Sequence, residues 1–378
     1  MKYDYIIVGA GLFGSVVAER IANILNKSVL VIDKRNHVGG NCYSHVDPDT
    51  GIEYHVYGTH IFHTSSRRVM DYVNRFTELN GYHHQVLTVH NDKVYQMPIN
   101  LETINSFYGT HFYPQDAYEF IQQEKARDAV ASPVNFEEKA ISQIGRPLYE
   151  AFIKSYTAKQ WQIDPKELPP QTFSRLPIRF NYNEDYFIDA RWQGIPINGY
   201  TDIFNKLLDS EKITVQLKCD YFENHEQLFY NKKLIYSGPI DQFFGYKFGR
   251  LSWRTIKLET HCHLGNDFQG TSVMNYADSD VTYTRIHEPR HLHPERNYQN
   301  NKSIIFYEYP EYNPQDPFYP VNTSKDKKKL TQYKELALKK QDLIISGRLG
   351  SYAYYDMDKT ILAALDCFDK LCEEMKRS

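Results

Sequence analysis

Residues 3–14 read Tyr-Asp-Tyr-Ile-Ile-Val-Gly-Ala-Gly-Leu-Phe-Gly, and this stretch decides the fold of the 378-residue chain. Its first half is a β-rich run, and its second half is a Gly-x-Gly-x-x-Gly turn. Apolar residues at helical spacing then continue to Leu25, and a second β-rich run over residues 28–32 ends at Asp33. This order and these lengths predict a β-turn-α-β unit of the Rossmann type.

The residues of this unit are suited to holding a dinucleotide. Gly9 permits the tight turn, Gly11 lets the backbone approach a pyrophosphate, and Gly14 lets the helix pack closely on the strand. The first amides of the helix and its dipole would then bind the pyrophosphate. Asp33 lies about 20 residues beyond the turn, where a carboxylate accepts from ribose hydroxyls. A glycine-rich turn without a ligand is the alternative, and the whole constellation disfavours it.

The bulk composition excludes several other classes of protein. A net charge of −3 gives no general attraction for nucleic acid or acidic membranes, so an anionic ligand needs local arginines. The five cysteines are scattered without a C-x-x-C pair, which argues against a disulfide framework or a cysteine-based zinc site and fits a reducing cytoplasm. No uninterrupted apolar run reaches about 18 residues, so we expect no membrane span.

The rest of the chain divides into segments that differ in their pattern of apolar residues and prolines. We expect helices over residues 69–79, 116–131, 136–144, 147–160 and 359–375. Residues 164–177 contain four prolines and predict an irregular loop of the kind that often closes an active site. Short alternating runs between residues 214 and 309, including 228–236, 251–260 and 303–309, predict an antiparallel sheet.

A second motif favours FAD over NAD as the dinucleotide. Arg35-Asn36-His37-Val38-Gly39-Gly40-Asn41 follows Asp33 directly and resembles the extended fingerprint of the large FAD family that includes amine oxidases. Near the C-terminus, Arg348-Leu349-Gly350 followed by Asp356-Met357-Asp358 resembles the segment that closes over the flavin in that family.

The expected fold class is α/β, with a Rossmann-type FAD-binding domain, an inserted helical bundle and an antiparallel β-sheet domain. We assign residues 1–68, about 194–225 and 335–378 to the FAD-binding domain. The helical substrate or lid domain takes about 100–193, with its loop at 164–178, and the sheet domain takes about 69–99 and 226–334.

Four further blocks resemble the bacterial UDP-galactopyranose mutase family in order and spacing, and the resemblance runs from residue 1 to the final helix. They are residues 58–63 (Gly-Thr-His-Ile-Phe-His), 152–161 (Phe-Ile-Lys-Ser-Tyr-Thr-Ala-Lys-Gln-Trp), 284–288 (Thr-Arg-Ile-His-Glu) and 348–357 (Arg-Leu-Gly-Ser-Tyr-Ala-Tyr-Tyr-Asp-Met). The family's inserted helical bundle and six-stranded sheet match the pattern described above.

The resemblance implies an isomerase that interconverts UDP-galactopyranose and UDP-galactofuranose without net redox change, although its flavin must be reduced. Reduced N5 carries a lone pair that attacks the anomeric carbon, so UDP leaves and a covalent flavin–sugar adduct forms. The resemblance also implies an electron donor such as NAD(P)H, a cytoplasmic homodimer, and a product used for galactofuranose in cell-surface glycan.

The resemblance assigns roles to individual residues as well. Arginine matches phosphate oxygens with a planar fork, and Arg175 and Arg285 correspond to the two diphosphate-binding arginines. The expected catalytic residues are Arg175, Arg285, Asp356 and His60. The expected substrate-binding residues are Phe152, Tyr156, Trp161, Arg175, Tyr186, Phe187, Arg285, Tyr319 and Tyr354. The expected cofactor-binding residues are Gly9, Gly11, Phe13, Gly14, Asp33, Lys34, Val38, Gly39, Gly40, Asn41, Gly58, Thr59, His60, Ile61, Arg254, Arg348, Tyr355, Asp356 and Met357.

Several alternatives stay open. The FAD motifs also fit an amine-oxidase-like oxidoreductase, and a non-catalytic nucleotide-sugar binder is a third possibility. Some relatives that accept UDP-N-acetylgalactosamine carry arginine at the position of His60, so histidine favours plain galactose.

The aromatic residues also suit core packing, and Asp356 also suits capping of the final helix. Two His-x-His pairs, at 261/263 and 291/293, lack an obvious third ligand, and we expect no metal. Arg290 and Arg296 suggest a solvated charged face around the second pair.

Overall fold

The computed structural model describes residues 2–128, 130–173, 178–298, 301–313 and 316–377. Within them, the predicted unit forms as β1 (Tyr3–Val8), α1 (Leu12–Leu25) and β2 (Val29–Asp33). It belongs to a five-stranded sheet in the order β16-β10-β1-β2-β9, in which every neighbouring pair is parallel. The other three strands are β9 (Ile213–Leu217), β10 (Tyr230–Tyr236) and β16 (Leu343–Ile345).

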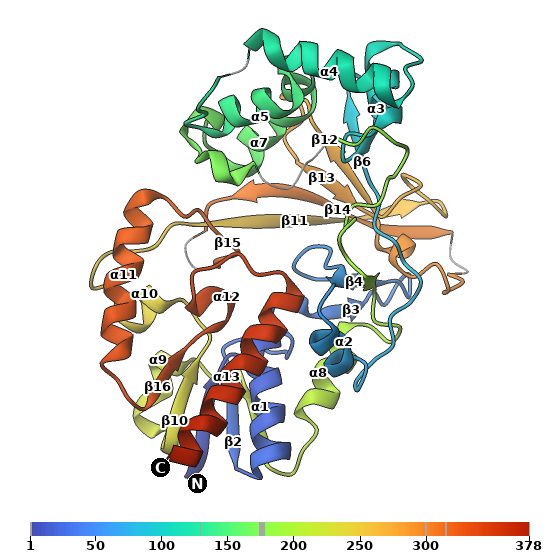
Figure 1. Ribbon diagram of the computed structural model, residues 1–378. Coiled ribbons are helices and arrows are strands. Elements are labelled where there is room, and N and C mark those ends of the chain that lie inside the picture. The colour runs from blue at the N-terminus through green and yellow to red at the C-terminus, as the bar shows by residue number, and fades with distance from the viewer. Residues whose placement is uncertain (1, 129, 174–177, 299–300, 314–315, 378) are drawn as a thin grey trace.

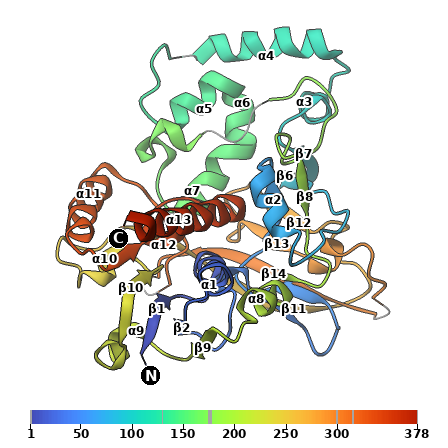
Figure 2. The ribbon, with the colours of Figure 1, turned by 60° about the horizontal axis from the view of Figure 1, so that its bottom comes forward.

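Both faces of this sheet are covered, as a parallel sheet requires. Ile7 and Val31 face a core that α1, α8 (Tyr200–Leu208) and α13 (Met357–Arg377) complete. Ile6 and Leu30 point to the opposite face and pack with Cys219. Helix α13 runs beside α1 in both views (Figures 1 and 2), so the C-terminal helix closes the unit that the N-terminal strand begins.

The assignment of residues 228–236 to an antiparallel sheet is wrong. These residues form β10, which lies between β1 and β16 and pairs with both in parallel. The strand begins at half-buried Tyr230, continues through exposed Asn231 and Lys232, and ends with buried Leu234, Ile235 and Tyr236. Its polar first half makes a strand of the covered parallel sheet resemble a half-exposed strand.

The second sheet has seven strands among the described residues, in the order β15-β11-β14-β13-β12-β6-β7. Its pairs are antiparallel except β12 with β6, and the resemblance had implied six strands. In Figure 1 this sheet lies between the parallel sheet and the helices α3 to α7. Its strands are β6 (Val86–His90), β7 (Lys93–Met97), β11 (Trp253–Leu264), β12 (Val273–Tyr276), β13 (Arg285–His287), β14 (Lys302–Glu311) and β15 (Tyr319–Pro320).

The helical region has its own apolar core. Side chains of Asn100 and Asn135 cap the first turns of α3 and α5 by accepting from backbone N–H groups. The helix expected over 147–160 is divided by a π-helical turn at Tyr149–Lys154, a feature frequent at functional sites. The helices are α3 (Leu101–Tyr108), α4 (Pro114–Asp128), α5 (Phe136–Ile144), α6 (Arg146–Leu148) and α7 (Ser155–Trp161).

Shorter elements connect these parts. The helix expected over 69–79 is α2 (Arg67–Val73), which ends six residues earlier than predicted and is capped by the Ser66 side chain. The remaining elements are β3 (Ser44–Val46), β4 (Glu53–His55), β5 (Phe62–Thr64), β8 (Trp192–Gly194), α9 (Tyr221–Asn224), α10 (Ile240–Phe243), α11 (Ser324–Leu338) and α12 (Gly347–Gly350). None of the described helices is both long and apolar enough to cross a membrane.

Candidate functional site

A cavity of about 1040 Å³ connects the two sheets. At one end it is lined by Val8, Asp33 and Tyr236, at or next to the carboxyl ends of three parallel strands. At the other end it reaches Tyr156 on α7 and Arg285 on β13. This volume is at the upper limit of the range of about 300–1,000 Å³ that is usual for ligand pockets. The cavity therefore has room for one long ligand or for two ligands end to end.

The glycines of the first turn form a cradle at the strand end of the cavity. A Cβ on Gly14 would lie 2.0 Å from the carbonyl oxygen of Gly9, so the helix packs against the turn too closely for any side chain. Gly40 approaches Gly11 closely, because a Cβ on Gly40 would lie 3.0 Å from Gly11 Cα. No side chain caps the start of α1 at Gly11, so its first amides are available to an anion.

The Asp33 carboxylate organises this turn. One oxygen accepts from the Ala10 N–H at 2.8 Å, and the other accepts from the Arg35 N–H at 2.9 Å. Asp33 lines the cavity, and its remaining lone pairs leave the predicted ribose contact available.

Most of the predicted cofactor residues line the cavity, with two exceptions. Gly14 lies behind the turn, where its role is close packing, and Val38 packs against the core beside α1. The residues that line it are Gly9, Gly11, Phe13, Asp33, Lys34, Gly39, Gly40, Asn41, Gly58, Thr59, His60, Ile61, Arg254, Arg348, Tyr355, Asp356 and Met357.

Arg348 is a half-buried cation in the wall of the cavity. Its guanidinium donates to the carbonyl oxygen of Phe318 and lies near Tyr319 and Cys42. Burial lowers the pKa of Arg348, and within the described ranges no ion pair joins it to a carboxylate. A buried charge requires a counter-ion. The wall therefore suits a ligand that brings negative charge to this point.

His60 has a defined tautomer. Its Nδ1 lies 2.6 Å from the carbonyl oxygen of Gly58, which can only accept, so Nδ1 carries the proton and Nε2 has a lone pair. Burial lowers the pKa of His60 to about 4, so the ring is neutral near pH 7. His60 lines the cavity and therefore offers it a hydrogen-bond acceptor.

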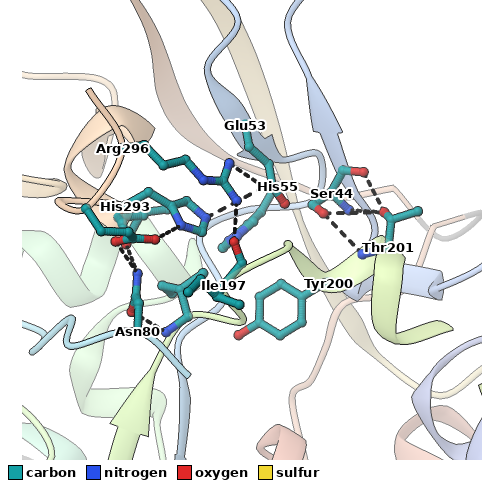
Figure 3. Close-up of polar contacts among 12 residues, drawn as sticks. Ser44, Glu53, His55, Asn80, Ile197, Tyr200, Thr201, His293 and Arg296 are labelled. Atoms are coloured by element: carbon teal, nitrogen blue, oxygen red, sulfur yellow. Dashed lines mark hydrogen bonds and ion pairs between the residues drawn. The ribbon is translucent and has the colours of Figure 1, made fainter. Parts of the chain in front are cut away.

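Two buried side chains hold the backbone of His60. His55 Nδ1 accepts from the His60 N–H at 2.9 Å, and the Tyr200 hydroxyl donates to the His60 carbonyl oxygen at 3.1 Å. The prediction of a solvated charged face around the second His-x-His pair is wrong for His293. Figure 3 shows Arg296 beside Glu53, with an N–O distance of 2.8 Å, and His293 is only 1% exposed.

The opposite end of the cavity is organised around Glu308 on β14. Its carboxylate lies 3.3 Å from Arg285 Nε and 3.0 Å from His287 Nε2, and Thr59 lies 2.7 Å from His287 Nδ1. Burial alone would raise the pKa of Glu308, but Arg285, then His287 and Thr284, lower it to about 2. Glu308 therefore stays ionised and orients Arg285, which also lines the cavity.

Aromatic side chains surround Arg285. The Tyr156 hydroxyl accepts a hydrogen bond from Arg285 Nη2, and the Phe187 ring stacks on His63 with a centroid distance of 3.7 Å. Phe152 lines the cavity but is 4% exposed and packs edge-on against Tyr95, so it serves the core as well. Trp161, Tyr186, Tyr319 and Tyr354 also line the cavity, and the rings of the last two are stacked at 5.7 Å.

Asp356 and Arg175 are the two remaining predicted catalytic residues. Asp356 lines the cavity directly before α13, and its carbonyl accepts the first helical hydrogen bond from Thr360. Arg175 lies outside the described residues, as do three of its neighbours in the loop at 164–178. Its predicted role therefore stays a prediction.

Comparison with known proteins identifies the family. The family model for UDP-galactopyranose mutase matches residues 151–354, and that for an NAD(P)-binding Rossmann-like domain matches residues 7–76. A probable UDP-galactopyranose mutase of Klebsiella pneumoniae is 40% identical over 97% of this chain and 94% of its own length. The chain belongs to the UDP-galactopyranose mutase family.

Two further similarities are informative. A dTDP-fucopyranose mutase of Escherichia coli is 36% identical over 96% of both chains. A solved structure of reduced UDP-galactopyranose mutase superimposes with a TM-score of 0.76, covering 99% of this chain and 94% of that one, at 14% identity. These comparisons confirm an isomerase with the predicted α/β fold class.

Several cavity residues of this mutase-family chain were not predicted. Glu308 and Asn275 reach Arg285 only through strand pairing, since both lie opposite it on neighbouring strands. Asn275 Oδ1 is buried beside the cavity without a hydrogen-bond partner among the described residues. His287 was inside a quoted motif, and its placement two residues after Arg285 on a strand was the available signal.

One group of potential metal ligands occurs in the described part of the chain, and it consists of Asp267, Glu288 and His291. The Glu288 carboxylate accepts from the N–H groups of Phe268 and Gln269 and from the Ser303 hydroxyl, so it is already satisfied by protein donors. The group lies outside the residues that line the cavity, and we propose no metal role for it.

Acid is expected to destabilise this mutase-family protein from about pH 6.5 downward. Burial lowers the pKa of His55 well below its ordinary value, that of His60 to about 4 and that of His84 to about 3. Unfolding returns them to about 6.5, so the unfolded chain binds more protons below that pH, at about 1.4 kcal/mol per pH unit and proton. The raised pKa of His291 opposes this in part.

We therefore expect the free energy of unfolding in urea to be about 4–6 kcal/mol lower at pH 5 than at pH 7.5. Replacing buried His84 by glutamine should reduce this difference, whereas His111→Gln, at an exposed position, should preserve it. Equal stability at the two pH values would contradict the neutral state of the buried rings.

Proposed function

We propose that this protein binds FAD and, when the flavin is reduced, interconverts UDP-galactopyranose and UDP-galactofuranose. The observation that carries the proposal is one cavity with a dinucleotide cradle at Gly9–Gly14 and a carboxylate-oriented arginine, Arg285, at its other end. A diphosphate at Arg285 places the attached sugar between that arginine and the flavin position. The family membership supports the substrate class.

The cavity residues fit both ligands. The uncapped start of α1 suits the pyrophosphate of FAD, and the glycine cradle leaves no room for side chains there. Arg348, a half-buried cation without a carboxylate partner among the described residues, would favour a flavin that becomes anionic on reduction. A bound and reduced flavin would supply a nucleophilic N5 that can form a covalent bond to the anomeric carbon as UDP departs.

The protein's own groups would support this chemistry by charge and position. Arg285 neutralises the departing diphosphate through charge-assisted hydrogen bonds, and we assign the same role to Arg175. Tyr186, Tyr319 and Tyr354 supply hydroxyls around the diphosphate and the sugar, and Tyr156, next to Arg285, flanks the uridine. Neutral His60 accepts from a sugar hydroxyl or from the flavin. Asp356 orients the sugar, and closure of residues 164–178 excludes water.

A direct assay tests the function. The purified protein is incubated with UDP-galactofuranose, first oxidised and then reduced with dithionite, and the products are separated. We expect conversion to UDP-galactopyranose only with the reduced protein. Equal turnover in both states, or no pyranose product in either state, would remove the proposal.

Substrate choice is decided in the same assay. We expect UDP-galactose to be preferred over UDP-N-acetylgalactosamine. A relative is named for dTDP-fucopyranose, so that sugar nucleotide is included as a competitor. Faster turnover of the dTDP sugar would reassign the base and sugar specificity without changing the reaction class.

The rival function is an amine-oxidase-like FAD oxidoreductase, because the motif at residues 35–41 is shared with that class. It predicts steady oxygen consumption with an amine, which the proposed isomerase does not. We further propose that the protein is a cytoplasmic homodimer, that a donor such as NAD(P)H reduces its flavin, and that its product supplies galactofuranose to cell-surface glycan.

A further inference from the structure

Lys159 on α7 occupies a cage of backbone carbonyl groups. Its Nζ donates to the carbonyl oxygens of Tyr276 at 2.8 Å, Asp278 at 2.7 Å, Val281 at 2.9 Å and Tyr283 at 3.2 Å. All four belong to one short loop, residues 276–283, which connects β12 to β13. A single ammonium group therefore holds four carbonyl groups of this loop together and fixes its path.

The cage suits a compact cation specifically. The ammonium is a point charge with three donors, whereas a guanidinium is a broad planar fork. The carboxylate of Asp278 is engaged elsewhere, because its two oxygens contact the His90 ring and the Asn91 N–H. Burial lowers the pKa of Lys159 to about 8, although Asp278 and Asp280 oppose this shift. The direct contacts of the positive charge are thus four carbonyl dipoles, and Asp278 and Asp280 add attraction from a longer distance.

The loop and the helix each lead to the diphosphate end of the cavity. Arg285 begins β13 two residues after Tyr283, and Tyr156 lies on α7 one helical turn before Lys159. The Tyr156 hydroxyl accepts from Arg285 Nη2 across the gap that Lys159 spans. Lys159 itself is not among the described residues that line the cavity, so any effect on a ligand must pass through its neighbours.

We propose that Lys159 is a positioning residue, which clamps the 276–283 loop to α7 and thereby places Arg285 against Tyr156 for diphosphate binding. This inference rests on the proposed function, because it assigns the diphosphate to Arg285. Without the ammonium, four carbonyls face one another without a donor, and their repulsion opens the loop. Arg285 then keeps its charge but loses its fixed distance from Tyr156.

The test compares Lys159→Met with Lys154→Met, which removes the same charge from an exposed position one turn earlier. UDP is titrated into each FAD-loaded protein by calorimetry. We expect Lys159→Met to bind UDP at least about tenfold more weakly than Lys154→Met, since charge-assisted hydrogen bonds are lost. FAD content should be equal in the two variants.

Chemical rescue separates positioning from general stability. Ammonium or methylammonium is small enough to enter the empty cage, so either should restore UDP affinity to Lys159→Met and leave Lys154→Met unchanged. Equal UDP affinity of the two variants overturns the inference. A weakening that ammonium does not restore, accompanied by loss of FAD, overturns it as well, because it marks a general structural role.

Two further measurements keep the outcomes distinct. If Lys159→Met does not fold, Lys159→Gln replaces it, because its amide keeps two donors, and the same comparison applies. If the unaltered protein does not bind UDP at all, the proposed function fails. If it binds UDP and Lys159→Met binds equally well, only the role of Lys159 fails.

Discussion

Replacing Gly14 by alanine is expected to give a folded protein that no longer retains FAD. The new Cβ would lie 2.0 Å from the carbonyl oxygen of Gly9 and 3.1 Å from the Ile7 side chain, so the turn or the helix must move. Overpacking of this kind costs up to about 3 kcal/mol, which corresponds to a loss of affinity of about 100-fold. The readout is the flavin absorbance of the purified protein and its titration with FAD.

Gly81→Ala is the matched control for this substitution. A Cβ at Gly81 meets no atom within 4 Å, so the same chemical change should leave FAD binding and mutase activity intact. Retention of flavin by Gly14→Ala at the level of Gly81→Ala would show that the cradle does not hold the dinucleotide.

The Arg285→Ala protein should lose turnover by between about ten- and one-hundred-fold, because a charge-assisted hydrogen bond contributes about 1.5–3 kcal/mol. It should also be less stable by about 3–5 kcal/mol, since Glu308 becomes a buried carboxylate without its main partner. The measurements are steady-state kinetics with the reduced protein and unfolding in urea.

A double variant separates the two effects. Arg285→Ala combined with Glu308→Gln removes the stranded charge, so stability should largely return while turnover stays low. Recovery of turnover in the double variant would mean that Arg285 acts only through stability. Activity of the single variant at the unaltered level would disprove its contact with the diphosphate.

The parts of the fold that can be predicted are those that depend on residues close to one another in the sequence. Gly9, Gly11 and Gly14 stand between two β-rich runs. The close contacts of Gly11 and Gly14 are with residues of the same βαβ region, whereas Gly9 is also required by distant Ser237, whose hydroxyl a Cβ would meet. The prediction for β10 is wrong because its exposed polar residues, Asn231 and Lys232, are unlike the continuous apolar run of a buried parallel strand, and only its pairing with β1 reveals the parallel sheet. Likewise the π-helical turn at Tyr149–Lys154 leaves no mark in apolar spacing.

The residues of the candidate site likewise divide into those that the sequence predicts and those that it does not. The arginines and tyrosines of the site are predicted because the resemblance assigns them, and those of the predicted set that the structure describes line one cavity. Glu308 was not predicted, because its contact with Arg285 depends on the register of two antiparallel strands that are not fixed by local sequence. Lys159 was quoted within a motif, but its four partners are carbonyls, which no side-chain pattern records.

The closure of the parallel sheet by β16 and of its outer layer by α13 has a consequence for biosynthesis. Both elements are translated after nearly all the rest of the chain, yet β16 pairs with β10 and α13 packs on α1. A ribosome-bound chain that ends before residue 343 therefore lacks one strand and one covering helix of the nucleotide-binding half, as well as Arg348. The parallel sheet therefore cannot be completed until the last part of this chain has left the ribosome.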